Sequence, residues 1–341
     1  MARMARRSLI EQLDEAVQAI IIHPSTPLPG VDVRIAPLIS VAAELRDLPR
    51  PDFKARLKAD LEREISSMRN SMLSNSTRSQ GTTTAVNPIR EGFHTITPYL
   101  IVDEAAGLID FVKDAFGADE LYRGTGSGAG IHCEVRIGDS MVMIGGGGGW
   151  RGKVMPTSLH LYVNDTDAVY QRALQAGATS VAQPVDQSYG DREAGVKDLA
   201  GNYWWIATHK GKKYIPEGLR SVTPYLHPRG ADRMVDFLKR AFRAEESGVY
   251  RSPDGTIVHA KVRIGSSLIE MGEAHGEYQP MPTTIYMYVE NADAVYKAAL
   301  AAGGTSLSEP ADQPYGDRNG GVRDPFGNEW YIATHISDVG M

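Results

Sequence analysis

Apolar residues recur with two different periods between residues 93 and 337. Runs such as IHCEVRIG, residues 131–138, alternate apolar and polar positions, which is typical of half-buried strands. Runs such as EAAGLIDFVKDAFG, residues 104–117, space apolar residues three and four apart, as an amphipathic helix does. The pattern predicts a strand, a helix and three strands, and then the same order again.

Residues 1–75 follow a purely helical pattern. Leu9, Leu13, Val17 and Ile20 form one apolar stripe, and a second stripe starts at Phe53. These stripes predict a small helical N-terminal segment whose default role is packing or formation of a homodimer, with regulatory docking as the alternative. The Ser/Thr-rich residues 76–92 lack periodicity and predict a flexible linker.

A duplication divides the rest of the chain. DQSYGDREAGVKDLAGNYWWIATHK, residues 186–210, recurs in altered form as DQPYGDRNGGVRDPFGNEWYIATHI, residues 312–336, and TPYL at residue 97 recurs at residue 223. The common offset predicts two homologous domains, residues 93–210 and residues 221–337, joined by a linker at residues 211–220.

Composition excludes several classes of function. The formal net charge of −6 and the pI near 5.9 give no basic footprint for nucleic acid. No apolar run approaches the roughly 20 residues of a membrane span, and acidic residues follow the basic start where a signal peptide would be apolar. We therefore expect a cytoplasmic protein. Its one cysteine, Cys133, lies on the apolar side of a predicted strand, which favours a packing role over that of a nucleophile.

The element order, with TPYL at the start and YGDR followed by GVRDPFGNEWYIATH at the end, resembles the vicinal oxygen chelate superfamily. That superfamily includes glyoxalase I, bleomycin-resistance proteins and extradiol dioxygenases, and the resemblance is greatest to its PhnB-like branch. It implies an α+β fold of tandem domains, each with two βαβββ units that form a cupped mixed sheet around a small ligand. Since single-copy relatives usually dimerise, the two repeats are expected to form an intramolecular pseudo-dimer.

Strand alternation indicates which side chains face the cups. Leu159 and Leu161, for example, belong to the core face, which leaves His160 and Tyr162 on the concave face. The predicted ligand-binding residues are Tyr99, His132, Glu134, His160, Tyr162, Trp205, His209, Tyr225, His259, Tyr286, Tyr288, Tyr331 and His335.

The resemblance implies metal ligands on the first and fourth strands of each unit. Those places fall on Thr97, Met143, Ser158, Trp205, Thr223, Glu270, Thr284 and Tyr331. Only Glu270 among them is a good ligand for a divalent ion, so no cofactor is expected. The alternative is a noncanonical metal site made by His132, Glu134, His160 and His209.

Three other motifs have structural explanations. GGGGGW, residues 145–150, reads as a crossover loop, with Trp150 able to close over a ligand. DPFGN at Asp324 reads as a hairpin turn. Arg192 and Arg318 in YGDR are predicted to form structural ion pairs rather than an anion clamp, and the neighbouring Tyr189 and Tyr315 are then the ligand contacts.

The aromatic and polar lining of the cups favours a protein that binds a small aromatic or cationic molecule for sequestration, resistance or sensing. The alternative is a lyase, isomerase or dioxygenase that uses a noncanonical metal or a histidine general base, with His132, His259 and Glu270 as catalytic candidates. A third hypothesis makes one repeat a structural pseudo-partner of the other. The two copies differ at cup positions, which predicts two different ligands or one vestigial site.

Overall fold

The computed structural model describes residues 86–276 and 278–338. The predicted N-terminal helices, residues 1–75, and residues 76–85 of the predicted linker lie outside this part of the chain. No helix within the described residues is long and apolar enough to cross a membrane.

The described residues form four βαβββ units, two in each repeat, as the sequence predicts. The first unit comprises β1 Ile96–Val102, α4 Ala105–Phe116, β2 Asp119–Thr125, the short 3-10 turn η2 Ser127–Ala129, β3 Ile131–Ile137 and β4 Ser140–Gly146. The second comprises β5 Ser158–Tyr162, α5 Thr166–Gln175, β6 Thr179–Asp186, β7 Asp191–Lys197 and β8 Tyr203–His209. The third comprises β9 Val222–Leu226, α6 Ala231–Phe242, β10 Glu245–Arg251, β11 Ile257–Ile264 and β12 Ser267–Met271. The fourth comprises β13 Thr284–Tyr288, α7 Ala292–Ala301, β14 Thr305–Asp312, β15 Asp317–Arg323 and β16 Glu329–His335.

Helix boundaries follow local sequence signals. The helix α4 is followed by Gly117 at φ 68°, a left-handed conformation that glycine adopts without steric cost. The helix α5 begins after Asp165, whose carboxylate accepts a hydrogen bond from the backbone N–H of Ala168. The polar residue and the glycine therefore fix the helix ends that the sequence predicts.

The strands form two eight-stranded mixed sheets, and each sheet combines one unit of each repeat. Sheet A has the order β14-β15-β16-β13-β1-β4-β3-β2, and sheet B has the order β10-β11-β12-β9-β5-β8-β7-β6. The repeats meet where β1 pairs antiparallel with β13 and where β5 pairs antiparallel with β9. This pairing corrects the expectation that the two units of one domain share a cup. The free edge of the first strand of each unit thus pairs with the first strand of a unit from the other repeat.

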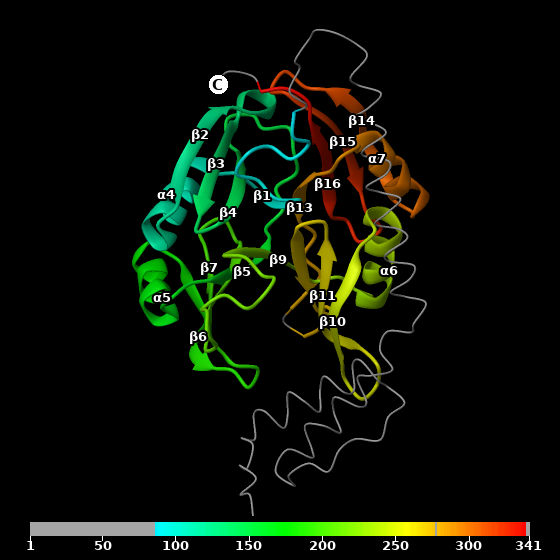
Figure 1. Cartoon of the computed structure of the whole chain (residues 1–341). Helices are drawn as coiled ribbons and strands as arrows, with labels where there is room; N and C mark the ends of the chain where they lie inside the picture. Colours follow the sequence, from blue (N-terminus) through cyan, green and yellow to red (C-terminus); the bar gives the residue numbers. More distant parts are fainter. Residues whose placement is uncertain (1–85, 277, 339–341) are drawn as a thin grey trace, which may run out of the picture. The chain divides into compact units, whose positions relative to one another are not determined.

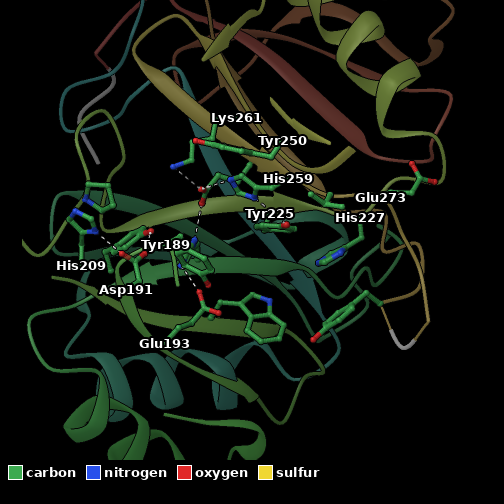
Figure 2. Close-up of a pocket in the computed structure, with 18 of the residues that line it drawn as sticks. Tyr189, Asp191, Glu193, His209, Tyr225, His227, Tyr250, His259, Lys261 and Glu273 are labelled. Atoms are coloured by element: carbon green, nitrogen blue, oxygen red, sulfur yellow. Dashed lines mark hydrogen bonds and ion pairs between the residues drawn. The ribbon is translucent and has the colours of Figure 1, made fainter. Parts of the chain in front are cut away.

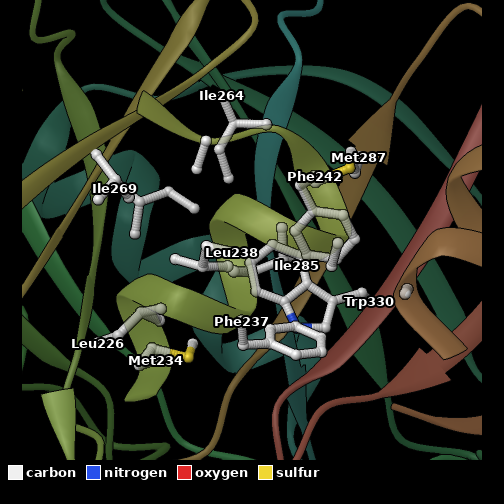
Figure 3. Packing of buried hydrophobic residues seen from close by; sticks show 14 of the residues in the cluster. Leu226, Met234, Phe237, Leu238, Phe242, Ile264, Ile269, Ile285, Met287 and Trp330 are labelled. Atoms are coloured by element: carbon white, nitrogen blue, oxygen red, sulfur yellow. The ribbon is translucent and has the colours of Figure 1, made fainter. Parts of the chain in front are cut away.

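Each repeat nevertheless keeps its own hydrophobic core. One core gathers α4, α5 and the strands of the first repeat, and the other gathers α6, α7 and the strands of the second repeat. Figure 1 shows the two helix pairs on opposite sides of the described part of the chain. Trp330, which is fully buried, packs against Phe242, and Phe242 also packs against Phe237 in the second core (Figure 3). The helices thus cover the convex faces of the strands and leave the concave faces without a helix.

Strand alternation predicts the two faces correctly. Leu159, Leu161, Trp204 and Ile206 are all buried in the core of the first repeat. Their neighbours His160, Tyr162 and Trp205 line a cavity on the other side of sheet B. The period-two rule therefore holds for the strands that build the site.

Candidate functional site

The concave face of sheet A, here called cup A, and that of sheet B, cup B, divide the predicted ligand-binding residues between them. Cup B holds the predicted residues His160, Tyr162, Trp205, His209, Tyr225 and His259. Strands of sheet A carry the remaining ones, Tyr99, His132, Glu134, Tyr286, Tyr288, Tyr331 and His335. The noncanonical metal set is not brought together, because His132 and Glu134 lie on β3 of sheet A whereas His160 and His209 lie on strands of sheet B. The exchange of units between the sheets is the reason.

Cup B contains a cavity of about 580 Å³ between the second unit and the third. Figure 2 shows polar and aromatic side chains from both units converging on it. The sequence reasoning missed several of its lining residues, namely Asp191, Glu193, His227, Tyr250, Glu273, His275 and Tyr278. For two of them, Asp191 and Glu193, a signal existed, because both lie in the strand β7 and share its alternation. Extending the alternation backwards from Gly195 places Glu193 and Asp191 on the concave face.

Aromatic rings form a continuous belt along this cavity. The ring centroids of Trp205 and Tyr278 lie 5.9 Å apart, and Tyr278 lies 6.0 Å from His227 at an interplanar angle of 8°. Tyr225 continues the belt at 4.9 Å from His227 and 5.9 Å from His259. Such edge and face contacts suit a planar organic group better than a phosphate.

His160 lies at the bottom of the cavity between two carboxylates. Its Nδ1 is 2.9 Å from Glu270 Oε2, and its Nε2 is 3.2 Å from Glu193 Oε2. Burial opposes protonation of the ring, but the charges of Glu270 and Glu193 raise the pKa of His160 to about 10. The residue is therefore an imidazolium at neutral pH.

Glu270 connects this cation to a second histidine. The carboxylate is almost completely buried, and its Oε1 lies 3.6 Å from His259 Nε2 and 3.7 Å from Lys261 Nζ. Burial opposes its charge, but the positive charge of His160 keeps the pKa of Glu270 low. Burial lowers the pKa of His259, so this ring stays neutral, and its Nδ1 lies 3.4 Å from the hydroxyl of Tyr225. Around Glu270, cup B thus places a buried cation and a neutral base.

The strand register moves two of the predicted metal positions. His160, and not Ser158, pairs with Thr223 across the junction of the repeats. Tyr225 pairs with Glu270, and its counterpart Tyr162 pairs with Ala207. The four positions in cup B that correspond to the metal ligands of the superfamily are therefore Thr223, Glu270, His160 and Ala207. His160 replaces the predicted position Ser158, and Ala207 replaces Trp205.

These residues do not fit a divalent metal. Both ring nitrogens of His160 face carboxylates, and Ala207 has no ligand atom. Among the described residues, no group of three or more His, Cys, Asp or Glu side chains has the arrangement of a metal site.

Cup A is filled by its own side chains. Tyr99, Met143, Tyr286 and Tyr288 are buried there together with Phe93. Trp150 of the glycine-rich loop packs against Tyr99, with ring centroids 6.2 Å apart, so it covers cup A. The two cups therefore differ in access as well as in sequence.

The remaining motifs are structural, as predicted. Arg192 pairs with Asp167 and Asp186, and Arg318 makes the equivalent pairs with Asp293 and Asp312. Asp324 accepts hydrogen bonds from Phe326 N, Asn328 N and Nδ2, and Trp330 Nε1, which holds the hairpin turn together. Cys133 is buried, and burial raises the pKa of its thiol to about 11, which leaves it unreactive. Of the two YGDR tyrosines, Tyr189 lines the cup B cavity.

Two cupped mixed sheets built from four βαβββ units define the fold class of this protein. Residues 92–206 and 228–332 match the family model described as the glyoxalase/bleomycin resistance protein/dioxygenase superfamily. These matches cover more than half of the chain. The chain therefore belongs to this superfamily.

Similar proteins add no activity to this assignment. An uncharacterized protein of Mycobacterium tuberculosis is 40% identical over 136 residues, which are 37% of this chain and 78% of the relative. An uncharacterized protein of Mycobacterium bovis is 42% identical over 120 residues, which are 32% of this chain and 79% of the relative. The crystal structure of glyoxalase I from Zea mays is similar over 70% of this chain and 92% of that chain, with a TM-score of 0.54 and 13% sequence identity. At that identity the likeness concerns the fold alone.

Proposed function

We propose that cup B binds a small organic molecule that combines an aromatic ring with a positively charged group, without a metal. The proposal rests chiefly on the cavity of about 580 Å³, which has an aromatic belt on one side and buried carboxylates at its base. Cavities of this size and lining typically enclose a small ligand. Sequestration, resistance or sensing is the biological role that we infer, and membership of the PhnB-like branch is part of the same proposal.

The charge balance of the cavity supports a cationic ligand. Asp191, Glu193 and Glu270 contribute three carboxylates, against which stand the cations of His160 and Lys261. A fourth carboxylate, Glu273, accepts hydrogen bonds from the backbone N–H groups of Gly230 and Ala231 at the start of α6. The excess of negative charge lines the same cavity as the aromatic rings, whose faces themselves attract cations. A cation with a ring satisfies both features.

The mouth of the cavity can adapt to such a ligand. Tyr189 and Tyr250 line the cavity, and yet these residues are 60% and 64% exposed. Exposed rings at an entrance lose solvent contact when they close over a bound planar group, which adds apolar burial to the binding energy. We therefore expect both tyrosines to contribute to affinity.

A matched series of ligands tests this proposal. We would titrate the protein with p-aminobenzamidine, p-aminobenzamide and p-aminobenzoate, which share a ring and differ in charge, and follow quenching of tryptophan fluorescence. We expect the cation to bind most tightly, and Glu193→Gln to weaken its binding by about tenfold, or about 1.4 kcal/mol, while the neutral amide is little affected. Equal binding of the cation and the anion would contradict the proposal.

A second candidate function is a lyase or isomerase that removes a proton from the bound molecule. The observation that favours it is the neutral His259, which lines the cavity and lies 3.6 Å from Glu270 Oε1. A neutral imidazole in a cavity can accept a proton at neutral pH, and the nearby carboxylate stabilises the imidazolium that forms. Exchange of a ligand C–H hydrogen with deuterated water, lost in His259→Gln, would support this function.

A further inference from the structure

The segment at residues 86–94, here called the strap, lies over cup A. The backbone carbonyl of Pro88 accepts a hydrogen bond from the N–H of His335, at 2.9 Å. The ring of Phe93 packs edge-on against Tyr288 with centroids 5.5 Å apart, and Ile89 packs against the same cluster. Residues 86–92 of the predicted flexible linker are therefore part of the folded unit.

Arg90 of the strap places its guanidinium inside cup A. It forms an ion pair with Glu134, whose side chain is only 4% exposed, and its guanidinium carbon lies 4.5 Å from the centroid of the Phe93 ring. Glu134 also lies 3.4 Å from His132, whose Nδ1 is 2.8 Å from the hydroxyl of Tyr99. A carboxylate, a ring face and a polar network thus surround one planar cation.

Cup B has an equivalent strap but neither partner of this ion pair, because Lys261 takes the strand position of Glu134, two residues after His259. A second strap, residues 212–220, is anchored equivalently, because the carbonyl of Tyr214 accepts a hydrogen bond from the N–H of His209 at 3.0 Å. The repeat offset places Pro216 where the first strap has Arg90, and Pro216 lines the open cavity. Tyr225 and His259 repeat the pair made by Tyr99 and His132. The filled cup and the open one therefore differ at both ends of the Arg90–Glu134 ion pair, where cup B has Pro216 and Lys261.

We propose that cup A is a second cation-binding site, which the guanidinium of Arg90 occupies from within the same chain. Its ligand class is a planar monovalent cation, a guanidinium or amidinium with a short alkyl group, held by Glu134 and the neighbouring rings. A tethered occupant has an effective concentration in about the millimolar range, so a free ligand of modest affinity does not displace it. The native chain then binds such a cation in cup B alone, and loss of Arg90 adds a second site.

Chemical rescue of Arg90→Ala tests this proposal independently of cup B. We would measure the melting temperature of the native chain and of Arg90→Ala with methylguanidinium, with the uncharged isostere methylurea, and with sodium chloride at equal ionic strength. We expect Arg90→Ala to melt below the native chain, and methylguanidinium to raise its melting temperature by about 2 °C or more beyond any rise in the native chain. Methylurea and sodium chloride should not produce this difference.

Two further variants make the test specific. Adding Glu134→Gln to Arg90→Ala should abolish the rescue, because the cation loses its carboxylate. Arg251→Ala is the matched control, since Arg251 pairs with Asp232 on the surface, and it should show no rescue. A folded Arg90→Ala without selective rescue, or rescue that persists with Glu134→Gln, would overturn the proposal. If Arg90→Ala fails to fold alone, methylguanidinium must restore its refolding yield, and failure to do so would equally overturn it.

Discussion

Replacement of His160 by glutamine should remove a large and pH-dependent part of the protein's stability. Glutamine keeps a hydrogen-bonding side chain in cup B but leaves Glu270 and Glu193 without the cation between them. The side chain of His160 is 8% exposed and that of Glu270 is 1% exposed, so solvent screens this interaction little. His160→Gln therefore leaves a buried negative charge with too little positive charge beside it.

The pKa of His160 gives the magnitude. It lies at about 10 in the folded protein, against an ordinary value of 6.5. Since each pKa unit corresponds to about 1.4 kcal/mol, the linked contribution to the free energy of unfolding is about 5 kcal/mol where it is fully present and about 4 kcal/mol at pH 7. Breaking a buried ion pair by removing one partner typically costs about 3 to 5 kcal/mol, which agrees. We expect His160→Gln to lose about 3 to 5 kcal/mol near neutral pH.

The sign of the pH dependence follows from the same pKa. Because the folded state binds the proton more tightly than the unfolded state, the stabilisation is fully present below about pH 6.5 and is lost as the pH rises through about 10. The difference in the free energy of unfolding between the native chain and His160→Gln should therefore be greatest at about pH 6 and should shrink towards pH 10.

Urea unfolding, followed by tryptophan fluorescence at several pH values, measures this difference. His209→Gln is the matched control, because His209 also pairs with a carboxylate in cup B but its side chain is 30% exposed, so its replacement should cost less. A difference between the native chain and His160→Gln that stays constant from about pH 6 to about pH 9.5 would refute the reasoning. In that case His160 would be neutral in the folded protein.

Three further predictions concern the ligand, the metal and the N-terminal segment. Trp205→Ala should weaken binding of p-aminobenzamidine by up to about tenfold with little change in melting temperature. Trp204→Ala, in the core, should instead cost about 3 to 5 kcal/mol of stability. If paired titration and melting experiments show the two effects reversed, the two faces of this strand are exchanged. Elemental analysis of protein purified without chelators should find no stoichiometric divalent metal, because Thr223 and Ala207 occupy two of the four family metal-ligand positions in cup B. About one zinc, iron or manganese per chain would contradict this prediction. A chain that starts at Asn87 should keep cooperative melting, since it retains Arg90 and both cores, and loss of cooperativity would show that the N-terminal segment is needed for folding.

The sequence by itself determined the repeats, the order of the elements and the faces of the strands. Each of these properties depends on local relations: Asp165 caps its own helix, Gly117 ends its own helix, and Leu159 and His160 point in opposite directions because successive residues of a strand always do. The same alternation identified six residues of the cup B cavity before any contact between distant segments was known. Local geometry is sufficient for predictions of this kind.

Only the tertiary structure decided which residues share a cup. His160 and Glu270 are 110 positions apart, and they meet because β5 pairs with β9 of the other repeat rather than with β1 of its own. Nothing in the pattern of either strand distinguishes these two pairings, since both bury the same apolar face and satisfy the same backbone hydrogen bonds. The position of Arg90 inside cup A, and the open cavity beside Pro216, depend on the same long-range choice. The charge of His160 arises only from the carboxylates that this choice places around it.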